Sequence, residues 1–238
     1  MRIAIFSDVH GNRFALEAVL EDLHSTRPDV LVNLGDQVWG AADPLGAWRL
    51  QQSLGAVTVR GNTDEFLSKS PAELGQAASL ADWLKAQLEP HTPQRLMSLP
   101  VTAEVADGEV VVAHGSLQSP SEALFLVGPP SQSRPAPDEM LAQARAFPRA
   151  RVVVVGHTHR EMLLSMSGVT FVNAGPVSRQ FDGLPLARWV LLEKRGSGWT
   201  VSFRRVEYDV EAAARWALEH APIGETEAAH LRSGIFPR

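Results

Sequence analysis

The side chains best suited to chemistry are carboxylates, an amide and imidazoles that directly follow short apolar runs. Asp8 and His10 come first, after the run from Ile3 to Phe6. A single histidine after a strand is more often structural than a metal ligand, but side chains that can bind metals recur here at five strand ends. The chain has no cysteine, so a metal would need oxygen and imidazole ligands. These positions predict one metal site, with Asp8, His10, Asp36, Asn62, His114, His157 and His159 as its residues.

The apolar runs predict the elements that position these residues. Runs such as 3–6 and 151–155 are typical of buried strands, and open α/β sheets bind ligands beyond the carboxyl ends of such strands. Between the runs, apolar residues at helical spacing predict amphipathic helices. The expected strands are 3–6, 29–34, 55–59, 101–105, 109–113 and 151–155, and the expected helices are 14–23, 45–54, 77–88, 94–97 and 138–147.

The second half of the chain is predicted to be richer in strands. Apolar runs at 161–165, 169–172, 186–192 and 199–206 predict an antiparallel set, followed by a helix at 210–220. Residues 119–137, rich in Pro and Ser, are expected to form an irregular, partly packed loop. Because this loop follows His114 closely and carries exposed-looking apolar side chains, we expect it to border the active site and to select the substrate. Residues 221–238 carry little pattern and receive no predicted role.

The composition limits the class of protein. A chain of 238 residues, 45% hydrophobic and 21% charged, is expected to form one domain over residues 1–238. Its apolar runs are too short for a membrane span or a signal peptide, so a cytoplasmic location and no membrane partner are expected. A net charge of −5 argues against a nucleic-acid-coating surface. A small nucleotide stays open as a ligand.

The order of the motifs resembles that of the calcineurin-like metallophosphoesterase superfamily. The blocks of this resemblance are Asp8-Val9-His10, Gly35-Asp36, Gly61-Asn62, His114-Gly115 and Gly156-His157-Thr158-His159. Three further blocks are more similar to the small bacterial and archaeal phosphodiesterases of that superfamily: Gly35-Asp36-Gln37-Val38, Val59-Arg60-Gly61-Asn62 and Asn173-Ala174-Gly175. The resemblance implies an α/β fold, a four-layer α-β-β-α sandwich of two mixed β-sheets flanked by helices.

The resemblance also implies two divalent metal ions as cofactors. Asp8, His10, Asp36 and His159 would hold one ion, and Asp36, Asn62, His114 and His157 the other, with Asp36 as the bridge. Two ions about 3.5 to 4 Å apart can share a hydroxide and clamp the oxygens of an in-line displacement at phosphorus. Manganese is the expected metal, and Fe, Zn, Ni, Co or Mg are alternatives. Asp36 and Asn62 are thus expected to be catalytic, together with Arg60, which could bind a phosphate oxygen or simply lie at the surface.

The expected function is a dinuclear metal-dependent phosphoesterase that hydrolyses a small soluble phosphoester by in-line attack of a metal-bridging hydroxide. Nucleases and cyclic-nucleotide phosphodiesterases are subclasses of this function. The alternative is a catalytically silent metal-binding scaffold or interaction protein of the same fold. That alternative expects missing ligands, whereas all seven ligand positions are filled in this chain.

A phosphodiester is favoured as the substrate because the chain departs from the protein Ser/Thr phosphatases of the superfamily. Thr63 and Trp39 occupy the places of their histidine and aspartate, which assist the leaving group. A missing general acid costs about 10² to 10⁴ in rate, but little where the leaving group is already stable as an anion. A monoester dianion would also bring extra negative charge beside Asp64 and Glu65. We therefore expect an activated diester to react faster than the matching monoester.

Overall fold

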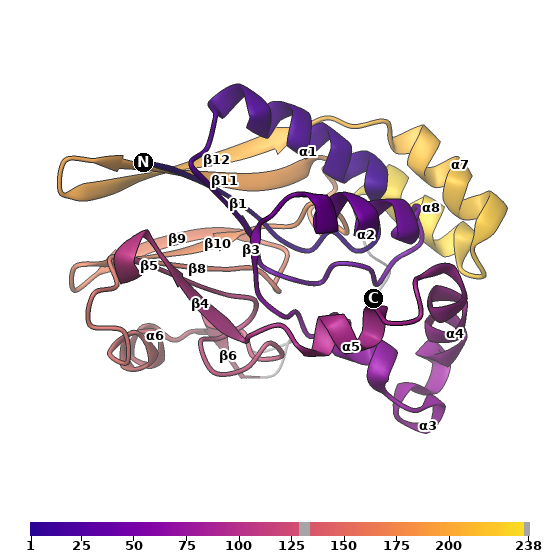
Figure 1. Ribbon diagram of the computed structural model, residues 1–238, viewed down its shortest axis with the longest axis horizontal. Coiled ribbons are helices and arrows are strands. Elements are labelled where there is room, and N and C mark those ends of the chain that lie inside the picture. The colour runs from indigo at the N-terminus through magenta and orange to yellow at the C-terminus, as the bar shows by residue number, and fades with distance from the viewer. Residues whose placement is uncertain (129–133, 236–238) are drawn as a thin grey trace.

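Two five-stranded mixed sheets packed face to face form the centre of the molecule (Figure 1). The computed structural model describes residues 1–128 and 134–235. The first sheet has the order β12 (Gly198–Val206), β11 (Ala187–Arg195), β1 (Arg2–Phe6), β2 (Val30–Asn33), β3 (Val57–Thr58). The second has the order β4 (Thr102–Val105), β5 (Val110–Ala113), β8 (Val152–Val155), β10 (Val169–Ala174), β9 (Glu161–Met166).

The core between the sheets follows from the alternation of side chains along strands that are apolar on both faces. In β1, Ile3 and Ile5 point into this central core, while Ala4 and Phe6 face the outer helices. In β8, Val152 and Val154 point into the same core, and Val153 and Val155 face outward. These continuous apolar strands therefore contribute to the core between the two sheets and to the two cores between each sheet and its helices.

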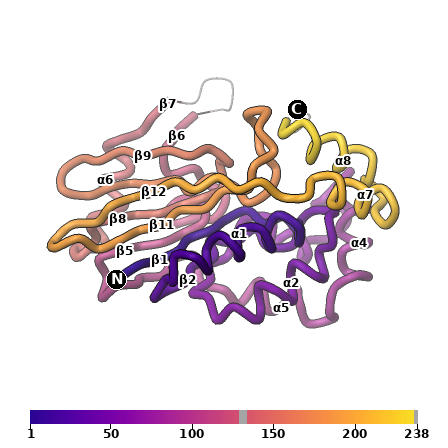
Figure 2. Tube along the Cα trace, turned by 90° about the horizontal axis from the view of Figure 1, so that it is seen from above, coloured from indigo at the N-terminus to yellow at the C-terminus, as the bar shows by residue number. Residues whose placement is uncertain are grey.

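Helices cover the outer face of each sheet (Figures 1 and 2). On the first sheet lie α1 (Arg13–Thr26) and α2 (Pro44–Ser53), and α1 buries Leu16, Val19, Leu20 and Leu23. On the second sheet lies α6 (Pro137–Ala144), which buries Met140 and Ala144. The predicted four-layer α-β-β-α sandwich is confirmed.

The remaining helices gather at one end of the sandwich (Figure 1). They are α3 (Pro71–Leu74), α4 (Ala78–Gln87), α5 (Thr92–Met97), α7 (Val210–His220) and α8 (Gly224–Ser233). The last of these was not predicted, because residues 221–238 were expected to carry no pattern. In the described part of the chain, no helix is both long and apolar enough to cross a membrane.

Two expectations for the second half need correction. The four predicted strands after residue 160 do form antiparallel pairs, but β9 and β10 join the second sheet whereas β11 and β12 join the first. In the loop 119–137, Leu124 and Phe125 are buried against the second sheet, so the side chains expected to be exposed are core residues. The loop also contains β6 (Leu126–Val127) and β7 (Arg134–Pro135), and its residues 129–133 lie outside the described residues.

Candidate metal centre

The predicted ligand residues meet where the carboxyl ends of the central strands come together. The parallel strands β1, β2 and β3 end at one edge of the first sheet, and β5 and β8 are likewise parallel in the second. The loops behind these ends carry, in chain order, Asp8 and His10 (β1), Asp36 (β2), Asn62 (β3), His114 (β5), and His157 and His159 (β8). The structure brings all seven residues into one connected set of short contacts.

Asp8, His10 and His159 form a first group of buried atoms that could hold a metal ion. Asp8 Oδ1 lies 3.2 Å from His159 Nε2 and 3.9 Å from His10 Nε2. The two imidazole Nε2 atoms are themselves 3.2 Å apart. Asp36 Oδ2 lies 3.6 Å from His10 Nε2, so the carboxylate expected to bridge borders this group.

A second group lies on the other side of Asp36. Asp36 Oδ1 is 3.5 Å from His114 Nε2. Asn62 Oδ1 lies 3.0 Å from His114 Nε2 and 2.8 Å from His157 Nδ1. Asp8 also reaches this side, with Oδ1 3.9 Å from His114 Nε2. The two oxygens of Asp36 thus face one group each, which is the arrangement a bridging ligand requires.

The set of ligand atoms fits a cation because, with the imidazoles neutral, several lone pairs converge. Backbone carbonyls face the Nδ1 atoms of His10, His114 and His159. A carbonyl oxygen can only accept, so each Nδ1 must donate its proton and each neutral ring keeps an Nε2 lone pair. Those lone pairs point at one another and at carboxylates. Asp8 Oδ1 is buried there and has no hydrogen-bond partner among the described residues. Bound metal ions would satisfy these acceptors.

Charge and burial act in opposite directions at these groups. Burial by itself would raise the pKa of Asp8, but the imidazoles of His159 and His114 outweigh it and lower that pKa. Burial lowers the pKa of His10 well below its ordinary value. Burial by itself would lower the pKa of His114, but the carboxylates of Asp36, Asp8 and Asp64 and the hydrogen bond to the Leu34 carbonyl together outweigh it and raise that pKa. The site therefore favours an ionised Asp8 next to a neutral His10, the forms in which both side chains bind metals.

The loops that carry the ligands are held in a backbone conformation that non-glycine residues rarely adopt. Positive φ angles occur at Asp8 (57°), His10 (47°), Asp36 (56°), His157 (68°) and His159 (55°). Such residues persist only where the surrounding contacts over-determine the backbone, and they cluster at functional sites. Their concentration here supports a functional role for this edge of the sheets.

Asp64 ties together the two loops that carry Asp36 and Asn62. Its buried carboxylate accepts hydrogen bonds from the backbone N–H groups of Asp36 (3.1 Å), Gln37 (2.9 Å) and Gly61 (2.8 Å). A Cβ on Gly61 would lie 2.2 Å from the Asp36 nitrogen, so only glycine permits this approach. Burial and the Asp36 charge raise the pKa of Asp64 to about 7. This carboxylate points behind the loops, so the expectation that its charge would meet the substrate is wrong.

Two residues that support the ligand loops, Asn173 and Arg179, were assigned no role from the sequence. Asn173 donates to the carbonyl of Gly156 at 2.6 Å and to Thr158 Oγ1 at 3.0 Å, so it fixes the loop before His159. Arg179, whose carbonyl faces His159 Nδ1, forms a buried ion pair with Glu227 of α8 at 2.9 Å. The Asn173-Ala174-Gly175 block was a signal for the first contact, whereas nothing in the sequence around residue 227 indicates the second.

Arg60, expected to bind phosphate, is already engaged in this structure. Its guanidinium donates to the carbonyl of Met97 at 2.7 Å and pairs with Glu65 at 3.1 Å. A phosphate contact would require Arg60 to exchange these partners, and the same pair offsets the negative charge of Glu65. Thr63 and Trp39 are both mostly buried; the N–H of Thr63 donates to Asp36 Oδ1 at 2.8 Å, and the Trp39 carbonyl faces His10 Nδ1.

Comparisons with known proteins agree with this architecture. The chain is similar to a metallophosphoesterase from Sphaerobacter thermophilus, with a TM-score of 0.79 and 28% identity over 99% of both chains. The protein PH1004 from Pyrococcus horikoshii gives a TM-score of 0.78 and 19% identity over 98% of both chains. The uncharacterized protein MJ0912 of Methanocaldococcus jannaschii is 27% identical over 235 residues, 89% of each chain. Residues 1–195 match the family model described as calcineurin-like phosphoesterase superfamily domain. The chain therefore belongs to the calcineurin-like phosphoesterase superfamily.

Proposed function

We propose that this protein hydrolyses a soluble phosphodiester with the help of two divalent metal ions. The proposal is carried by the convergence of imidazole lone pairs on the buried carboxylates of Asp8 and Asp36. Asp8, His10, Asp36 and His159 would hold one ion, and Asp36, Asn62, His114 and His157 the other. Manganese as the metal and the cytoplasm as the location are part of the proposal.

The protein's own residues would set the geometry of the reaction. Two bound divalent ions supply Lewis acidity and lower the pKa of water. Asp36 is fixed by the N–H of Thr63 and by the hydrogen bond from its own N–H to Asp64, so its carboxylate keeps its orientation between the two groups of ligands. His157 is only half-buried, which leaves the Asn62 side of the site the more open one for a phosphate. Asn62, which contacts two imidazoles, would orient a substrate oxygen from there.

The identities of Thr63 and Trp39 favour a substrate with a stable leaving group. Neither side chain can donate a proton as an acid at neutral pH, so an alkoxide would leave without assistance. Phe181 adds an apolar surface at the rim, because it is 45% exposed and its ring centre lies 5.0 Å from that of His159. Both features suit a diester that carries an aromatic group.

Metal dependence is the first test. Protein isolated without chelator should contain two divalent ions per chain, and chelation should abolish hydrolysis of bis(p-nitrophenyl) phosphate. Asp36→Ala should lose both ions, because it removes the carboxylate that faces both groups. Full turnover after chelation, or two retained ions in Asp36→Ala, would overturn the proposal. Protein that keeps two ions but hydrolyses no ester would instead be the silent scaffold.

Substrate preference is the second test. With saturating Mn²⁺, kcat/KM for bis(p-nitrophenyl) phosphate should exceed that for p-nitrophenyl phosphate, and alkyl monoesters should be poor substrates. Thr63→His should shift the ratio towards monoesters, because it restores an imidazole near the leaving group. Thr63→Val, similar in size and without a proton donor, is the control. A wild-type preference for the monoester would contradict the diester assignment.

A further inference from the structure

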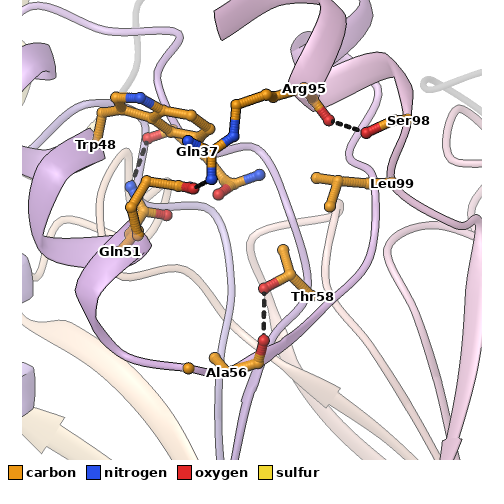
Figure 3. A pocket seen from close by; sticks show the side chains of 10 residues that line it. Gln37, Trp48, Gln51, Ala56, Thr58, Arg95, Ser98 and Leu99 are labelled. Carbon is orange, nitrogen blue, oxygen red and sulfur yellow. Dashed lines mark hydrogen bonds between the residues drawn. The ribbon is translucent and has the colours of Figure 1, made fainter.

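A polar pocket of about 320 Å³ lies apart from the proposed metal ligands, between α2, β3 and α5 (Figure 3). Gln37 and Trp48 line it from the α2 side, Thr58 from β3, and Arg95 and Ser98 from α5 and its C-terminal end. None of its lining residues belongs to the metal centre, and none is acidic. Pockets of this size are typical of small-molecule sites.

Gln37 gives this pocket an unused hydrogen-bond donor. Its side chain is 1% exposed, and its Nε2 has no hydrogen-bond partner among the described residues. Figure 3 shows the Gln37 amide lying between the Trp48 ring and Leu99. Buried polar groups are nearly always paired, so an unpaired amide that lines a pocket indicates that a ligand atom completes it. The ligand atom must be an acceptor.

Arg95 gives the pocket a positive charge. Its guanidinium lies over the Trp48 ring, with Cζ 5.5 Å from the ring centre, and donates to the side chain of Gln52. It forms no ion pair with a carboxylate in the described part of the chain. The nearby Glu89 pairs instead with Arg49 at 3.7 Å. A cation at a pocket without acidic residues favours an anionic ligand.

Two hydroxyl groups complete the lining. Ser98 donates to the Arg95 carbonyl at 2.7 Å, and Thr58 donates to the Ala56 carbonyl at 3.1 Å. Each hydroxyl proton is therefore used, while the oxygen lone pairs stay available as acceptors. The ligand should thus offer O–H groups as well as an oxyanion.

We propose that this pocket is a second ligand site that binds a small hydroxylated oxyanion, bearing phosphate or carboxylate, through Arg95 and the Gln37 amide. The site is connected to the metal centre, because Gln37 directly follows Asp36 and both backbone N–H groups donate to Asp64. Occupancy of the pocket would act on the segment that carries the proposed bridging carboxylate.

The test is a calorimetric titration of the metal-loaded full chain with inorganic phosphate and, separately, with tartrate. One class of sites is expected at the metals and a second in the pocket. The side-chain Nε–H resonance of Arg95 should shift with the second class alone. Arg95→Ala should weaken that class at least tenfold, and Arg95→Lys should weaken it less because the charge remains. Arg49→Ala removes a nearby surface arginine and is the matched control.

The two probes distinguish a phosphate ligand from a carboxylate ligand. Saturation of the pocket class by phosphate alone would assign a phosphorylated ligand, and saturation by tartrate alone would assign a hydroxy acid. The proposal is overturned if neither probe shows a second class, or if folded Arg95→Ala binds both classes as the wild type does. Circular dichroism of each variant establishes that it is folded.

Discussion

The carboxylate of Asp64 should support the metal centre although it binds no metal itself. Asp64 is completely buried and receives three backbone hydrogen bonds, two of them from Asp36 and Gly61 to the same oxygen, Oδ2. The third comes from the N–H of Gln37 to Oδ1. Asp64→Ala would leave three amide donors of two adjacent loops without acceptors. The loops that carry Asp36 and Asn62 would lose their common anchor.

The magnitude follows from the number of donors left unsatisfied. Each buried unsatisfied group costs about 1 to 3 kcal/mol. Water that enters the space of the missing side chain recovers part of this, so we take the lower value and expect a loss of about 3 kcal/mol. For a chain of this size, 1 kcal/mol shifts the Tm by about 2 °C, which gives a decrease of about 6 °C. Residues that orient ligands typically contribute 10- to 100-fold in metal affinity.

Calorimetric unfolding of the metal-free protein and a Mn²⁺ titration measure both effects. Glu65→Ala is the matched control, because this neighbouring acid forms only a partly exposed ion pair with Arg60, and such pairs contribute about 0 to 1 kcal/mol. If Asp64→Ala binds two ions with wild-type affinity and unfolds within a degree of the wild type, the reasoning is refuted.

Two further predictions concern α8. Glu227→Gln should destabilise the fold by about 3 kcal/mol and weaken metal binding about tenfold, because it removes the carboxylate that pairs with the buried Arg179 guanidinium. Exposed Glu225→Gln on the same helix is the control, and equal effects of the two changes would contradict this role. Burial lowers the pKa of His230 to about 4. The unfolded chain therefore binds a proton first as pH falls, and His230 by itself should lower the stability by about 2 kcal/mol between pH 7 and pH 5. Urea unfolding of His230→Gln should show a smaller decrease, and an identical pH dependence would disprove the assignment.

The fold and the ligand positions were predictable because both depend on local sequence. Val152 to Val155 is apolar at every position, which is typical of a strand buried on both faces, and His157 follows directly where such a strand must end. The same pattern before Asp8 and His114 places three loops at strand ends. The structure then adds the contacts between the loops, such as the 3.2 Å approach of His159 to Asp8 across the two sheets.

The supporting residues were not predictable because their roles depend on contacts between distant segments. Asp64 lies two residues after Asn62 in the chain, and its charge was expected to lie beside the substrate. The structure instead turns its carboxylate onto the N–H groups of residues 36, 37 and 61. Helix α8 buries Glu227 and His230, residue types that apolar periodicity cannot detect. Their burial becomes favourable only where partners such as Arg179 and the carbonyl of Gln180 are present.

The strained loops explain why these distant contacts are needed. Five of the seven proposed ligands have positive φ angles, and a non-glycine residue in that region costs of order 1 kcal/mol or more. The ligand atoms are acceptors that repel one another at these short distances, so without metal the ligands cannot hold this geometry by themselves. Hydrogen bonds from outside the ligand set must hold it, and those of Asp64, Asn173 and Arg179 are among them. Because Arg179 is in turn paired with Glu227, the rigidity of the centre extends beyond residues 1–195, the part that matches the family model.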